Sequence, residues 1–178
     1  MNNRPVDHSQ EFRKILESAY KCCRQHQRES WILEPFENVE GNFRGVIYAR
    51  STTPIPGSAF TFSLEIDPTR LAEPPIIRFN EALKHPFVFP GNGMYCFPQD
   101  FINGISCRTP IDEILDLLVK SFFLQKPYFK SIKYNLNSKD MPYINVEAAN
   151  LEYKNPELFW KQLRECGNLS LYSQDFFK

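Results

Sequence analysis

The chain has 178 residues, which is enough for one domain built around a single hydrophobic core. Its 21 Lys and Arg residues balance 21 Asp and Glu residues, which removes the usual electrostatic case for a nucleic-acid or anionic-membrane partner. No apolar run approaches the roughly 20 residues that a transmembrane helix needs, and the first residues lack the apolar core of a secretory signal. We therefore expect a cytoplasmic or organelle-associated protein.

The cysteines and histidines give no support to metal or cofactor chemistry. None of the five cysteines forms a Cys-x-x-Cys pair, and the three histidines do not cluster along the chain. Zinc sites usually show such spacings, so we expect no metal site and no cofactor. An odd number of cysteines without a regular framework is typical of a reducing compartment.

The first half of the chain predicts one helix followed by a β-meander. Apolar side chains recur at helical spacing over residues 9–24, with Asp7 or Ser9 as the expected cap. Alternating apolar and polar residues then indicate short strands, and Pro35 places the first of them at a sheet edge. The predicted strands cover residues 31–36, 42–50, 60–66 and 76–79.

A second, strongly amphipathic helix is expected to begin at Pro110 and to lie across the sheet. Thr109 is the predicted N-cap, and Asp112 and Glu113 suit the positive end of the helix dipole. One face of this helix is apolar throughout, which requires a sheet to cover it. Its members are Ile111, Ile114, Leu115, Leu118, Val119, Phe122 and Phe123.

The last third of the chain predicts a polar surface segment over 125–141 and two further helices. Asn145 is the expected cap of the first helix, and Asn155 followed by Pro156 opens the second, which Gly167 should stop. We expect residues 1–8 to form an N-terminal tail and 9–166 the domain. The apolar C-terminal tail, 167–178, should pack on this chain or on a partner.

Five short motifs in this order resemble the ubiquitin-conjugating-enzyme family over residues 9–166. The resemblance implies an α+β fold with an N-terminal helix, a four-stranded antiparallel meander, a central helix and C-terminal helices. The motifs are Thr53-Pro54 with Gly57-Ser58-Ala59-Phe60, then Pro74-Pro75 to Phe79, His85-Pro86, Thr109-Pro110, and Asn145-Val146-Glu147-Ala148-Ala149 through Phe159.

The loop after His85-Pro86 departs from the pattern of an active family member. In that family an Asn follows His-Pro and is thought to stabilise the oxyanion, whereas this chain has Phe87, which has no donor. Losing one oxyanion donor costs about 10²–10³ in rate. The loop looks closest to the catalytically inactive branch, in particular the fused-toes (AKT-interacting) type. That resemblance implies a binding partner within multiprotein complexes.

Two residues of this loop are candidates for chemistry. Cys96 lies eleven residues after His85, one further than is usual for the family's active cysteine, and its sequence neighbours include no cation that would lower a thiol pKa. We therefore expect Cys96 to be a half-buried apolar residue and not a nucleophile. His85 is expected to hold the loop through a hydrogen bond to the backbone and not to act as a base.

The loop is crowded with aromatic residues, which suggests a surface for other protein subunits. Our main hypothesis is a non-catalytic scaffold or accessory subunit that docks through this loop and the C-terminal tail. Two alternatives remain open: an active enzyme that forms a thioester at Cys96, and a domain that binds ubiquitin or a peptide non-covalently. The predicted docking residues are Phe87, Phe89, Tyr95, Phe97 and Phe101.

Overall fold

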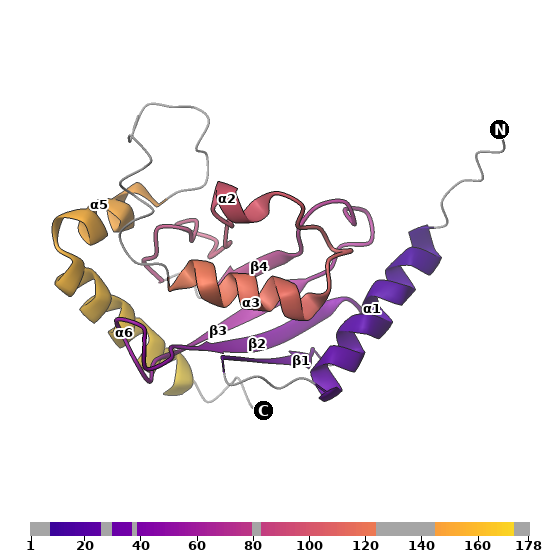
Figure 1. Cartoon of the computed structure of the whole chain (residues 1–178), viewed down its shortest axis with the longest axis horizontal. Coiled ribbons are helices and arrows are strands. Elements are labelled where there is room, and N and C mark those ends of the chain that lie inside the picture. The colour runs from indigo at the N-terminus through magenta and orange to yellow at the C-terminus, as the bar shows by residue number, and fades with distance from the viewer. Residues whose placement is uncertain (1–7, 26–29, 37–38, 80–82, 124–144, 173–178) are drawn as a thin grey trace.

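The computed structural model describes residues 8–25, 30–36, 39–79, 83–123 and 145–172 (Figure 1). The polar segment expected at 125–141, the cap candidate Asp7 and the last six residues of the C-terminal tail lie outside the described residues. Among the helices within these ranges, none is both long enough and apolar enough to pass through a membrane.

The four predicted strands form one antiparallel sheet in the order β1-β2-β3-β4, as the meander requires. The strand β1 lies at the edge, as its Pro35 predicted, because a proline cannot donate a ladder hydrogen bond. The register pairs Phe43 with Leu64, and Leu64 with Ile77 on the next strand. All three of these side chains are buried. The strands are β1 (Trp31–Pro35), β2 (Asn42–Tyr48), β3 (Ala59–Glu65) and β4 (Ile76–Phe79).

The helices cover one face and the two ends of this sheet (Figure 1). Helix α3 (Ile111–Phe122) lies across the sheet, and its predicted apolar stripe is largely buried. Helix α1 (His8–Gln25) packs against β1 and α3, whereas α5 (Val146–Lys154) packs on α6 (Pro156–Tyr172), which itself packs on β3. A short helix that the sequence did not reveal, α2 (Gln99–Ile102), interrupts the long loop before α3.

Two of the predicted helix caps are confirmed and one is wrong. The side chain of Asn145 accepts a hydrogen bond from the backbone N–H of Ala148 at 3.1 Å, and Asn155 caps α6 in the same manner. Thr109 does not cap α3, because Pro110 occupies the cap position. The Thr109 hydroxyl instead accepts from the N–H of Ser106 at 3.1 Å and so closes the preceding turn.

Gly167 was expected to stop the last helix, and this expectation is wrong. Helix α6 continues through Gly167 to Tyr172, so the first residues of the expected tail belong to the helix. A Cβ atom at position 167 would lie 2.8 Å from the ring of Phe60 and 3.1 Å from the carbonyl oxygen of Ala59. The glycine therefore allows α6 to approach β3 closely.

Candidate functional site

The segment from Phe87 to Cys96 is a narrow hairpin that follows the His-Pro pair. The N–H of Cys96 donates to the carbonyl oxygen of Phe87 at 2.8 Å, and the N–H of Phe89 donates to Met94 at 2.8 Å. At the tip, the Asn92 side chain accepts from the N–H of Met94 at 2.9 Å, which is typical of an Asx turn. Residues 87 and 96 are thereby fixed opposite one another.

This hairpin adds to the free edge of β4. The N–H of Tyr95 donates to the carbonyl of Ile77 at 2.7 Å, and the N–H of Phe79 donates to Gly93 at 2.8 Å. Gly93 has a φ of 68°, which L-residues with a side chain rarely adopt. The loop therefore covers an edge that would otherwise expose unpaired backbone groups, and it forms a rigid part of the fold.

His85 is fully enclosed and holds the hairpin to the end of α3. Its Nδ1 accepts from the N–H of Phe87 at 3.2 Å, and its Nε2 lies 2.9 Å from the carbonyl oxygen of Phe122, to which the neutral ring donates. The imidazole also stacks on the Phe122 ring, with centroids 4.3 Å apart. Burial lowers the pKa of His85 from 6.5 to about 4, although the bond to Phe122 opposes that shift. The ring is neutral at physiological pH, and both nitrogens are engaged within the protein.

Cys96 is half-buried, and its thiol lacks the surroundings that activate a nucleophile. Burial raises the pKa of Cys96 from 9.0 to about 11, and no charged group among the described residues opposes this shift. At pH 7 about one thiol in ten thousand is then ionised. A nucleophilic attack from this position requires a proton acceptor, and His85 cannot supply one because its ring nitrogens are already engaged.

The predicted docking aromatics separate into a buried and a partly exposed group. Phe87, Tyr95 and Phe97 lie in the core with 4%, 5% and 7% of their surfaces exposed, so they cannot form a docking surface. The expectation of an exposed patch is wrong for these three, since the hairpin folds them inward over α3 and β4. Phe89 and Phe101 remain partly exposed.

Two polar contacts of this aromatic cluster were not found from the sequence. The Tyr95 hydroxyl and the Ser121 hydroxyl are 2.7 Å apart, and both are buried. Lys120 lies over the ring of Phe101, with its Nζ atom 5.7 Å from the ring centroid. The sequence offered one signal for the first contact: Ser121 lies beside the apolar stripe of α3, and a buried tyrosine hydroxyl needs a hydrogen-bond partner.

Over the ranges that the structure describes, no three His, Cys, Asp or Glu side chains gather into a cluster that could hold a metal ion. What the loop provides is a partly covered thiol, a neutral histidine bound on both sides, and an apolar side chain at the position after His-Pro. This arrangement favours a structural role for the loop.

Comparison with solved structures identifies the fold. The chain is similar to a protein described as a novel ubiquitin-conjugating enzyme, with a TM-score of 0.62 and 17% identity over 91% of this chain and 99% of that one. It is also similar to a proposed ubiquitin conjugating enzyme from Plasmodium yoelii, with a TM-score of 0.60 and 20% identity over 93% and 96% of the two chains. No family model and no curated protein matches the chain. The protein therefore has the ubiquitin-conjugating-enzyme fold.

Proposed function

We propose that the protein is a non-catalytic member of this fold, of the inactive branch that includes the fused-toes type, and that it serves as a scaffold or accessory subunit. The observation that carries the proposal is the side chain of Phe87. It follows His85-Pro86, is 4% exposed and packs against the rings of His85 and Tyr95. Stabilising an oxyanion from this position requires a polar side chain that can donate a hydrogen bond near the thiol, and the phenylalanine side chain has no donor.

The environment of Cys96 supports the same proposal. The thiol pKa is raised by burial, and the His85 imidazole is occupied by the backbone of Phe87 and Phe122. Cysteines that act as nucleophiles usually have a cation, a helix N-terminus or a general base beside them. The hairpin is better suited to fixing the shape of the surface than to transferring an acyl group.

The proposed partners are other protein subunits, with ubiquitin as a further candidate. Phe89 and Phe101 are the predicted docking aromatics that remain partly exposed, and Ile102, which follows Phe101 in the sequence, is 39% exposed. The C-terminal tail after Tyr172 is the second proposed contact. An accessory subunit of this kind buries such side chains permanently against its assembly.

Native purification tests the scaffold role. The tagged chain, isolated from its own cells under mild conditions, should elute with a constant set of other proteins at fixed stoichiometry. Phe89→Asp combined with Phe101→Asp should release that set, whereas Cys96→Ser should retain it. A chain that elutes alone, or an assembly that survives the double substitution and is lost with Cys96→Ser, contradicts the proposal.

The second candidate is an active conjugating enzyme, and one observation favours it. Cys96 is only half-buried, and its backbone is bonded to residue 87, so the thiol lies beside the His-Pro loop. Incubation with an activating enzyme, ATP and ubiquitin would then give a reducible adduct that disappears with Cys96→Ser. Such an adduct would replace the scaffold proposal.

A further inference from the structure

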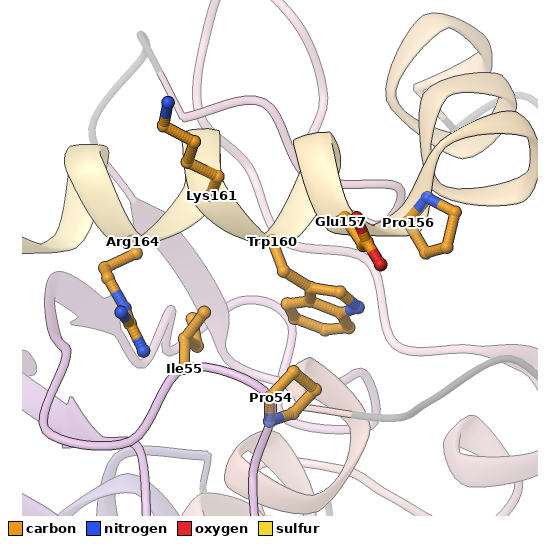
Figure 2. A pocket seen from close by; sticks show the side chains of 7 residues that line it. All are labelled: Pro54, Ile55, Pro156, Glu157, Trp160, Lys161 and Arg164. Carbon is orange, nitrogen blue, oxygen red and sulfur yellow. The ribbon is translucent and has the colours of Figure 1, made fainter.

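A groove of about 420 Å³ lies between the loop that joins β2 to β3 and the first half of α6 (Figure 2). Pro54 and Ile55 form its loop side, and Trp160 and Arg164 extend towards them from the helix. Glu157 lies at the Pro156 end. The groove shares no lining residue with the hairpin that carries Cys96.

Both sides of this groove are held in place. In the loop, the N–H of Gly57 donates to Ala49 at 3.2 Å, and the N–H of Ser58 donates to Ile55 at 3.2 Å. The Ile55 side chain is fully buried beneath the groove. On the helix side, the Trp160 ring meets the buried Phe159 ring edge-on at 4.8 Å. The groove is therefore preformed, as is usual for ligand sites.

The charges around the groove are uneven. Lys161 and Arg164 are exposed on α6, against one carboxylate, Glu157. Within the described ranges of the chain, neither cation forms an ion pair or a side-chain hydrogen bond. Arg164 extends to the same side of α6 as the half-buried indole of Trp160, whereas the Lys161 ammonium points away from it (Figure 2). The two unpaired cations attract a carboxylate that arrives together with an apolar side chain, and Arg164 is its direct partner.

We propose that this groove, the α6 groove (Pro54, Ile55, Glu157, Trp160, Lys161 and Arg164), binds an extended segment of a partner protein that carries an apolar side chain next to a carboxylate. Pro54 and Trp160 provide flat apolar surfaces for a proline or an aromatic ring, and Arg164, one turn from Trp160, pairs with the adjacent carboxylate. The inference adds a second contact surface to the protein and does not depend on whether Cys96 is reactive.

A selection of random short peptides displayed on phage, made against the full chain, tests this inference. Enriched peptides should share an Asp or Glu next to a proline or an aromatic residue. The same peptides, made synthetically, should bind Lys161→Glu/Arg164→Glu at least about tenfold more weakly, because attraction becomes repulsion. The matched control is Arg13→Glu/Lys14→Glu, which makes the same charge change on exposed positions of α1 and should leave affinity unchanged.

Trp160→Ala should also abolish binding, and circular dichroism of that variant shows whether it remains folded. The inference is overturned if nothing is enriched, if the enriched peptides lack acidic residues, or if the α6 and α1 variants bind them equally. It is equally overturned if sedimentation shows that the free chain forms a dimer which Lys161→Glu/Arg164→Glu dissociates, because a second copy would then occupy the groove.

Discussion

Lowering the pH should destabilise the protein through His85 before most carboxylates are protonated. The folded state encloses this imidazole in its neutral form, with one nitrogen bonded to Phe87 and the other to Phe122. Protonation would turn the Nδ1 acceptor into a donor that faces an N–H group, and it would place a charge in the apolar core. The unfolded chain has no such constraint and binds the proton readily.

The size and direction of the effect follow from the two pKa values. His85 has a pKa near 6.5 when exposed and about 4 in the folded protein. Its contribution to stability is therefore complete above pH 6.5 and falls as the pH drops from 6.5 towards 4, because the unfolded chain takes up the proton first. The unfolding free energy should fall by about 2 kcal/mol at pH 5 and by roughly 3 kcal/mol below pH 4 from this group alone.

Urea denaturation at pH 7.5 and pH 5 measures this change. His8 and His26 are replaced by alanine in the reference protein, so that His85 is the only histidine left to titrate. His85→Gln in that background should be less stable at pH 7.5 but should lose about 2 kcal/mol less on acidification. If both proteins show the same difference between the two pH values, or if the His85 ring titrates near 6.5 by NMR, the structural role assigned to this histidine is refuted.

Two substitutions test the C-terminal helices. Gly167→Ala should lower the unfolding free energy by about 1–3 kcal/mol, measured by urea denaturation, because the added methyl group meets the buried Phe60 ring. Glu165→Ala, on the exposed side of α6, is the control and should leave the unfolding free energy unchanged. If Gly167→Ala stabilises the protein, as helix propensity alone would give, the packing of α6 on β3 is contradicted. Asn145→Ala should lower the unfolding free energy by about 1 kcal/mol, because the hydrogen bond from the N–H of Ala148 to the capping side chain is lost. Asn145→Ser, whose hydroxyl can also cap the helix, should keep most of that stability. Equal stability of the two variants would argue against the cap.

Local sequence patterns predicted the strands and helices in which buried apolar side chains recur at a regular spacing. The strand from Ala59 to Glu65 alternates visibly, and the stripe of α3 recurs at helical spacing, so both could be located from the sequence. Asn145 was also readable, because a helix cap depends on neighbours three residues away. These features need no knowledge of distant contacts.

The error at Thr109 is local, because Pro110 takes the cap position. The other errors occurred where a distant contact decides the outcome. Gly167 is a good helix stop by local rules, but Phe60, more than a hundred positions earlier, needs a position without a side chain there. The aromatic residues of the loop were singled out as docking residues, but their spacing did not show that the hairpin folds back on β4 and encloses Phe87, Tyr95 and Phe97. The α6 groove joins residues of two distant segments, so no spacing within either one predicts it.

The most direct test of the non-catalytic proposal is the intact mass of the chain after incubation with an activating enzyme, ATP and ubiquitin. A known active conjugating enzyme serves as the positive control in the same tube, and Cys96→Ser as the matched variant. The proposal predicts that the control gains one ubiquitin while this chain keeps its own mass. A reducible gain of one ubiquitin that Cys96→Ser removes would contradict it.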